Sequence, residues 1–274
     1  MRPVRYAGLV APFLPVALLY GVALALPLAT IVSNALSLTG AEWLELLQEP
    51  IFMHAVRNTV VDCVVISTMG TLLAYALAAA IWRAGPTWRV ILIGLVIIPF
   101  WTSVLVKVVA WEAILRDNGL LNTVLLRLGL IATPLVMLHA STAVIVGMIQ
   151  YVLPFAVFPI LGVLLRLDPQ LELAADSLGA GPLRSFSLVI LPLSAPGILA
   201  AFMLIFVICT GFYVIPATLG SPADGMIANV VAVYALQLVD FNQASAIGLV
   251  LVVAVLLLTV LYNRISHATA GTAH

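Results

Sequence analysis

Residues 168–192 read DPQLELAADSLGAGPLRSFSLVILP and form a polar, helix-forming stretch inside an otherwise apolar chain. Asp168 suits the N-cap of a helix, because its carboxylate can accept a hydrogen bond from a free backbone N–H group. Gly179 is predicted to end that helix in a left-handed turn. The Gly-Pro pair at 181–182 restarts a second short helix, which Pro192 is predicted to end. The stretch therefore predicts a helix, a glycine turn and a second helix, with small side chains that let a partner surface approach the backbone.

The chain as a whole has the composition of a membrane protein. It is 64% hydrophobic and only 8% charged, with a mean hydropathy of +1.23, whereas a soluble domain carries about 25% charged residues. Eleven basic and eleven acidic residues balance, so no nucleic-acid partner is indicated. Cys63 and Cys209 stand in apolar runs and indicate neither a disulfide nor a metal site. We expect an all-α, polytopic protein of the lipid bilayer.

A membrane-spanning helix needs about 20 apolar residues. Six segments meet this requirement and are predicted to span the membrane, roughly 9–32, 58–82, 89–111, 134–165, 193–215 and 243–263. Pro154 and Pro159 predict a kink in the fourth. Thr39 and Glu42 form a predicted capping box at the start of a short helix on the membrane surface. No repeat or linker interrupts the chain, so residues 1–274 are predicted to form a single transmembrane domain.

The distribution of Lys and Arg predicts the orientation, because cytoplasmic loops carry the excess of positive charge. With the N-terminus inside, the inner side holds Arg2, Arg5, Arg83, Arg89, Arg166, Arg184 and Arg264. The outer side holds Arg57, Arg116, Arg127 and, near that end of the third span, Lys107. Both termini and the loop at 166–192 are therefore predicted to lie in the cytoplasm.

The 168–192 stretch resembles the signature cytoplasmic loop of binding-protein-dependent (type I) ABC importer permeases. That pattern runs Glu-Ala-Ala, three residues, Gly, nine residues, Ile, any residue and Leu-Pro. The residues at matching positions are Ala174, Ala175, Gly179, Leu191 and Pro192. The chain departs from the pattern twice, since Leu173 occupies the Glu position, with Glu172 one residue earlier, and Val189 replaces Ile.

A second block is similar to spermidine/putrescine permeases within this family. It runs from 97 to 135 and contains PFWTS, AW and NGLLN in that order. The runs VILPLSAPGI at 189–198, GFYVIPATLG at 211–220 and MIANV at 226–230 match the same group. The resemblance thus covers most of the chain and implies transport of a polyamine. Permeases for opines, phosphonates and other small polar solutes look alike and remain the alternative.

The resemblance implies a type I importer permease fold in a bacterial cytoplasmic (inner) membrane. Two permease subunits, either identical or related, would form the path by alternating access, above a dimer of a separate ABC ATPase. A soluble periplasmic or extracellular substrate-binding protein would dock on the outer side. The residues implied to seat in the ATPase groove, or to lie at its edge, are Glu172, Ala174, Ala175, Gly179, Arg184, Leu191 and Pro192.

The sequence independently places nucleotide chemistry on another chain. A P-loop needs a Lys in Gly-Lys-Ser/Thr to reach the phosphates, and the only Lys of this chain is Lys107, between two valines. We therefore predict that the chain is not an enzyme and has no catalytic residue or cofactor of its own, with ATP and Mg²⁺ bound by the partner ATPase.

Polar and aromatic side chains in the spans are candidates for the substrate path, because a charge at the bilayer centre costs roughly 2.5–3.5 kcal/mol. Glu112 follows Trp111 at the outer end of the third span, and a carboxylate beside an aromatic ring suits a cationic amine. The alternative is an interfacial Trp with a solvated carboxylate. Trp101 and Thr102 follow Pro99, where a broken helix would expose polar groups to a cavity; the alternative is packing.

Three more positions have two readings each. Tyr151 in the fourth span either lines the path or packs. Asp240, at the outer entrance of the sixth span, either attracts a cation or the binding protein, or caps the helix. Asp62 either faces the path or pairs with Lys107 or Arg57. Further candidates in the last outer loop are Asn229, Tyr234 and Gln237.

Two other classes of membrane protein fit the sequence less well. An ion-driven secondary transporter would want an internal repeat and a pair of acidic or His side chains within the spans, and the sequence shows neither. An intramembrane serine protease would want a nucleophile on a Gly-rich motif and a facing His. Ser141 and His139 are two residues apart, which on a helix places them on different faces.

Overall fold

The structure is a computed structural model that describes residues 14–168 and 170–271. Over these residues it contains helices and no strand, which confirms the predicted all-α class. Five helices are long and apolar enough to cross a membrane, and a sixth span is reached if one sharply bent pair counts as a single element. The five are α2 (Leu14–Ser37), α4 (Pro50–Arg83), α8 (Ser141–Leu164), the run Pro182–Thr210 and α14 (Phe241–Gly271).

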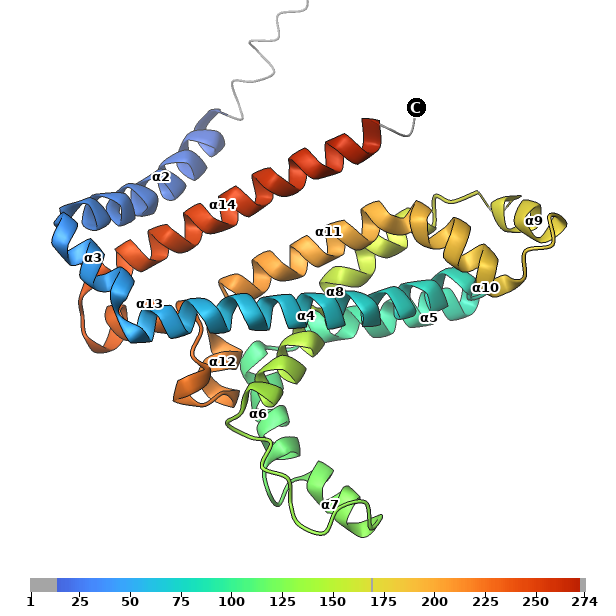
Figure 1. Cartoon of the computed structure of the whole chain (residues 1–274), viewed down its shortest axis with the longest axis horizontal. Helices are drawn as coiled ribbons and strands as arrows, with labels where there is room; N and C mark the ends of the chain where they lie inside the picture. The colour runs from blue at the N-terminus through green and yellow to red at the C-terminus, as the bar shows by residue number, and fades with distance from the viewer. Residues whose placement is uncertain (1–13, 169, 272–274) are drawn as a thin grey trace, which may run out of the picture.

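The core of the molecule is a bundle of three of these helices. The run Pro182–Thr210 comprises α10 (Pro182–Ser185), a π-helical turn η3 (Phe186–Ile190) and α11 (Leu191–Thr210). Helices α4, α8 and α11 pack against one another along most of their length (Figure 1). Their facing side chains are fully buried and aliphatic, among them Ile66, Met148, Ile160 and Ile205.

Close backbone approach holds α11 against α8. A Cβ atom added at Gly197 would lie 3.1 Å from the Cα atom of Ile160 and 3.1 Å from the carbonyl oxygen of Pro159. Small residues at such crossings are the usual way for membrane helices to gain packing contacts, because lipid supplies no hydrophobic driving force between them. Gly197 therefore sets the distance between the two helices.

Helices α2 and α14 form a second pair, which lies beside the three-helix core (Figure 1). Asn34 on α2 donates its side-chain amide to the hydroxyl of Ser245 on α14 at 3.5 Å. The short helix α3 (Gly40–Gln48) joins α2 to α4 and begins with the predicted capping box. The backbone N–H of Thr39 donates to the Glu42 carboxylate at 2.7 Å, and the N–H of Glu42 donates back to the Thr39 hydroxyl at 3.4 Å.

The predicted third span, 89–111, is broken in the structure. It divides into α5 (Pro86–Ile97), the 3₁₀ turn η2 (Ile98–Trp101) and α6 (Val104–Leu115), and the two halves meet at 98°. Pro99 lies in the turn and has no N–H to continue the helical ladder. This confirms the hypothesis of a helix broken after Pro99. Helix α7 (Leu120–Arg127) follows α6 and projects with it from the bundle (Figure 1).

Other boundaries also differ from the prediction. The fourth span was predicted from 134, but α8 begins at Ser141, and His139 precedes it with a φ of 56°. The prediction that Pro192 ends a helix was wrong, since the helix continues to Thr210. The π-helical turn η3 ends two residues before Pro192, and the N–H of Leu191 bonds to the carbonyl of Phe186. This wider turn accommodates the proline ring, which would clash in a regular helix. Residues 9–13 of the predicted first span lie outside the described residues.

The segment between α11 and α14 consists mostly of short helices rather than of an irregular loop. It contains α12 (Val214–Leu219), the 3₁₀ turn η4 (Pro222–Asp224), α13 (Ile227–Ala232) and the π-helical turn η5 (Val233–Gln237). Helix α13 contacts α4 and α14. Helix α9 (Gln170–Ser177) lies near the opposite end of α4 (Figure 1).

Replacing Gly197 with Leu should separate α8 from α11. The new side chain would overlap backbone atoms that cannot move away, so we expect a loss of about 1–3 kcal/mol in stability, read as a lower thermal midpoint in detergent. Gly162→Leu is the matched control on α8, because a Cβ atom there meets nothing within 4 Å. Equal midpoints for the two variants would contradict the assigned packing.

Candidate functional site

The first functional region is the helix–turn–helix loop at one end of α4. The Asp168 carboxylate accepts a hydrogen bond from the N–H of Gln170 at 2.9 Å, at the start of α9. Gly179 has a φ of 79°, and the N–H of Ala180 bonds to the carbonyl of Ala175 at 3.0 Å. This is the hydrogen-bond pattern of a left-handed helix end. The predicted helix and glycine turn are thus present.

The predicted coupling residues divide between this loop and the helix behind it. Glu172 forms an ion pair with Arg83, the last residue of α4, at 3.4 Å. Ala174, Gly179 and Arg184 are exposed, whereas Ala175 is buried. Leu191 and Pro192 are partly exposed on α11, beyond the loop. The exposed tip also carries two apolar side chains, since Leu178 and Leu183 are 88% and 79% exposed.

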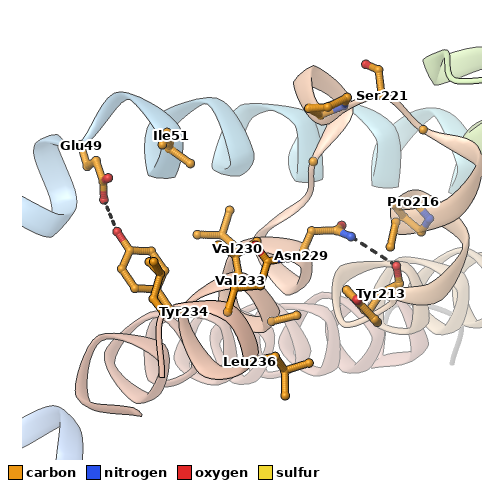
Figure 2. Close-up of a pocket in the computed structure, with 17 residues that line it drawn as sticks. Glu49, Ile51, Tyr213, Pro216, Ser221, Asn229, Val230, Val233, Tyr234 and Leu236 are labelled. Carbon is orange, nitrogen blue, oxygen red and sulfur yellow. Dashed lines mark hydrogen bonds between the residues drawn. The ribbon is translucent and has the colours of Figure 1, made fainter. Parts of the chain in front are cut away.

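The second region is a cavity near the other end of α4, shown in Figure 2, with a volume of about 480 Å³. Its walls include the three residues that the sequence placed in the last outer loop, Asn229, Tyr234 and Gln237. The Tyr234 hydroxyl donates to the Glu49 carboxylate at 2.6 Å, and the Asn229 amide donates to the carbonyl of Tyr213 at 3.3 Å. Burial and the neighbouring Glu49 raise the pKa of Tyr234 to about 12, so its hydroxyl remains a donor at neutral pH.

Polar side chains of α4 hold the wall of this cavity in place. The Asn58 amide donates to the carbonyls of Ala223 and Gly225, at 2.7 and 3.3 Å. The N–H of Ile227 donates to the Thr59 hydroxyl at 2.8 Å. These bonds fix the segment that carries η4 and the start of α13, where no regular ladder could satisfy the backbone.

Asp224 ties the same wall to α8. Its carboxylate accepts hydrogen bonds from the hydroxyl of Ser141, the first residue of α8, and from the hydroxyl and N–H of Ser221. Burial alone would raise the pKa of Asp224, but these hydrogen bonds hold it below its ordinary value. Ser141 therefore serves as an anchor for Asp224. His139 lies outside α8, so the predicted argument from opposite helix faces does not apply to this pair.

The predicted path residues do not form one cluster. Trp101 ends η2 and is 88% exposed, and the Thr102 hydroxyl bonds to the carbonyl of Pro99 at 2.9 Å. Trp111 packs toward Gly147 of α8, its Cδ1 atom 3.9 Å from where a Cβ would lie, and Glu112 beside it is half-buried.

Tyr151 and Asp240 have defined contacts. Tyr151 packs against Phe212, with ring centroids 4.6 Å apart. The Lys107 ammonium lies over the Tyr151 ring, 5.2 Å from its centroid. The Asp240 carboxylate accepts from the N–H groups of Asn242 and Gln243, at 3.1 and 3.0 Å. The structure thus gives Asp240 the helix-capping role that was one of its two predicted readings.

The predicted pairing of Asp62 is wrong. Asp62 is buried on α4, and over residues 14–168 and 170–271 it forms no ion pair with Lys107 or Arg57. Sequence reasoning also missed Glu49 and Tyr213 as cavity residues and Lys107 as the neighbour of Tyr151. Glu49 could have been noticed from its position directly before Pro50, at the start of α4. The contact of Lys107 with Tyr151 joins segments far apart in sequence, so no local pattern indicates it.

The geometry defines a class of protein. Apolar helices cross the bilayer, and one span is broken at its middle. A largely apolar cavity with a few polar side chains lies near one end of α4, and an exposed polar helix pair lies near the other. Among the residues that the structure describes, no group of His, Cys, Asp and Glu side chains could hold a metal ion. This is the architecture of a transport subunit that lets a polar solute through a membrane.

Comparison with known proteins identifies the family. The chain is 31% identical to the spermidine/putrescine transport system permease protein PotB of Haemophilus influenzae over 215 residues, covering 78% of this chain and 75% of that protein. It is 31% identical to PotB of Escherichia coli over 221 residues, covering 80% of both. The chain therefore belongs to the ABC importer permeases of the PotB family. No protein-family model matches it.

The fold agrees with this assignment. Two crystal structures of a bacterial ABC transporter for the polysaccharide alginate, one in complex with an alginate-bound periplasmic protein, contain a chain that superposes with a TM-score of 0.79. The sequence identity is 19%, and the superposition covers 96–97% of this chain and 96% of the other. At that identity the similarity concerns the fold, which is that of an ABC importer permease.

Asp224→Asn should weaken the cavity wall in a pH-dependent way. Because the folded-state pKa lies below the unfolded value of about 3.9, the hydrogen bonds stabilise the protein above that value and are lost as the pH falls through the folded-state pKa. We expect a loss of about 1 kcal/mol at pH 7, after allowing for solvent screening. The thermal midpoints of variant and wild type should converge as the pH falls below about 3.9.

Asp117→Asn, at an exposed position, is the control and should match the wild type throughout this range. A difference between Asp224→Asn and wild type that does not change with pH would show that the carboxylate charge is not what holds Ser141 and Ser221.

Proposed function

We propose that the chain is the permease subunit through which an ATP-driven importer moves polyamines such as spermidine and putrescine into the cell. The observation that carries the proposal is the 31% identity to two PotB proteins over about four-fifths of the chain. The protein itself contributes the path and its alternating access, and it hydrolyses nothing.

Charge near the cavity supports a cationic solute. A second cavity of about 430 Å³ is lined by three carboxylates together with Tyr234 and Gln243. The carboxylates belong to Glu42, Glu45 and Glu49, and Glu49 also lines the first cavity. Clefts lined by charge of one sign concentrate ions of the opposite sign. Each positively charged amino group of a polyamine would be attracted by these carboxylates.

The distribution of basic residues supports the sidedness. The positive-inside rule places the α9–α10 loop and both termini in the cytoplasm, and the cavity with its carboxylates on the outer side. The subunit then lies in the bacterial cytoplasmic membrane, with its acidic mouth facing the compartment from which substrate arrives.

The loop of α9 and α10 is proposed to dock into the partner ATPase, a dimer that binds ATP and Mg²⁺. Glu172, Ala174, Gly179 and Arg184 form its polar and small-residue surface, and the buried Ala175 supports it from behind. The exposed side chains of Leu178 and Leu183 add apolar area that the isolated chain leaves in water, and exposed apolar surface of this kind is a feature of interaction sites. Leu191 and Pro192 connect this surface to the transmembrane part of α11.

Two further partners complete the proposed assembly. A second permease subunit, a copy of this chain or a related one, would close the path on its open side. A soluble substrate-binding protein would deliver the solute to the outer face; the alginate transporter has been crystallised in complex with an alginate-bound periplasmic protein.

Solute-stimulated ATP hydrolysis tests the proposed substrate. We would reconstitute the full complex in lipid with its ATPase, second permease and binding protein, and add spermidine, putrescine, opines, phosphonates or amino acids in turn. Polyamines should raise the ATPase rate severalfold, and the other solutes should leave it near the basal rate. Stimulation by another solute alone would overturn the polyamine assignment while keeping that of an importer permease.

The loop assignment has its own test at Gly179. Asp and Asn both tolerate a positive φ, and a side chain at Gly179 meets nothing within 4 Å in this chain, so Gly179→Asp and Gly179→Asn should both insert and fold. Gly179→Asp should abolish ATPase association and uptake, because it introduces a buried charge at the interface, whereas Gly179→Asn should keep part of both. Wild-type uptake by Gly179→Asp would show that the loop is only a connector.

A further inference from the structure

Lys107 is the only lysine of the chain and has an unusual setting. It lies on α6, just beyond the break in the third span, and is half-buried. Its ammonium is 5.2 Å from the centroid of the Tyr151 ring. Within the described ranges 14–168 and 170–271, no carboxylate lies within ion-pair distance of it. An aromatic ring thus takes the place that a counter-ion would usually occupy.

The contact between Lys107 and Tyr151 lies deep within the membrane-spanning part of the protein. Tyr151 is the eleventh residue of α8, about 15 Å from one end of that helix and about 20 Å from the other at 1.5 Å per residue. The ammonium therefore lies near the middle of a membrane-spanning helix. Charges at such depth face the interior of a bundle or a water-filled cavity rather than lipid. The face shared by α6 and α8 around Lys107 is accordingly assigned to the aqueous path.

Tyr151 belongs to a row of four aromatic rings. The Phe100 and Phe155 rings are 4.7 Å apart, those of Phe155 and Tyr151 5.8 Å, and those of Tyr151 and Phe212 4.6 Å. The four come from η2, α8 and the residues after α11, which the broken third span brings together. Phe100 is 43% exposed and the other three are partly exposed, so the row is open on one side.

We propose that the Tyr151 ring and its aromatic neighbours form an ammonium-binding position in the path, that Lys107 occupies this position when no substrate is present, and that an amino group of the polyamine displaces it. This proposal rests on the proposed function and adds where the substrate binds and what competes for the site. Two like charges on one ring face repel each other, so the tethered and the free ammonium exclude one another.

Competition from Lys107 would lower the affinity of the path for the polyamine. A transport path must bind its solute strongly enough to admit it and weakly enough to release it. Lys107 meets this condition because its own ammonium must leave before the substrate can bind, and its return expels the substrate. Methionine at this position would keep the length of the side chain but remove the competing charge.

The position of Lys107 can be observed directly, because the chain contains no other lysine. We would methylate the full-length protein reductively with ¹³C-formaldehyde, which preserves the positive charge, and record its NMR spectrum in lipid nanodiscs. Lys107→Arg identifies the signal by its loss. The Lys107 methyl signal should be shifted upfield by the Tyr151 ring current. It should move to the position of a free lysine in Tyr151→Leu, and in wild type when spermidine is added, but not when uncharged butanediol is added.

Transport measurements on the full complex give the second readout. In Lys107→Met, the spermidine concentration for half-maximal ATPase stimulation should fall about threefold to tenfold, the range expected for a cation–π competitor. Lys107→Arg and Tyr151→Phe keep the charge and the ring, and both should stay within about twofold of wild type. Tyr151→Leu should raise the half-maximal spermidine concentration by a similar factor. A variant that failed to fold would instead show no stimulation at any concentration.

Stimulation of the wild-type complex by spermidine is read first, since its absence would refute the proposed polyamine substrate rather than the position of Lys107. If spermidine stimulates the complex but leaves the Lys107 signal unmoved, displacement is refuted. If Lys107→Met loses stimulation while Lys107→Arg keeps it, the lysine binds an anionic group instead, and the proposal is wrong.

Discussion

Every backbone N–H and C=O group inside a bilayer needs a partner within the protein, and this requirement shapes the whole chain. Helices α4, α8 and α11 meet most of this requirement with their own helical hydrogen bonds, and Gly197 lets α8 and α11 approach each other at the backbone. Where Pro99 cannot donate, the chain turns at once, and both the N–H and the hydroxyl of Thr102 bond to the Pro99 carbonyl. The Pro99 carbonyl is therefore paired within the break itself.

The need to pair backbone groups also shapes the end of the protein that holds the cavity. The segment between α11 and α14 contains only short helices, which leave many backbone groups unpaired. Asn58 and Thr59 of α4 bond to that backbone, and Asp224 gathers hydroxyl donors from two elements. Polar side chains at these positions thus stabilise irregular structure, which in turn keeps Tyr234, Asn229 and Glu49 around an open volume.

Features with a local cause were predictable from the sequence. The capping box at Thr39, the left-handed turn at Gly179 and the break after Pro99 each depend on a few neighbouring residues, and the loop pattern indicated the family. The end of a helix at Pro192 was mispredicted because a π-helical turn offers proline an alternative that composition does not reveal. Contacts between distant segments, such as that of Lys107 with Tyr151, depend on how the broken span folds back, and no local signal encodes them.

Helix α4 connects the two functional regions through a single element. Its 34 residues form a rod about 51 Å long, with Arg83 bound to Glu172 at one tip and the Asn58 bonds to the cavity wall close to the other. No proline lies inside the rod after its first residue, so it lacks the commonest cause of a helix kink. If α9 docks on the ATPase as proposed, a displacement of the loop would reach the cavity wall through this one stiff element.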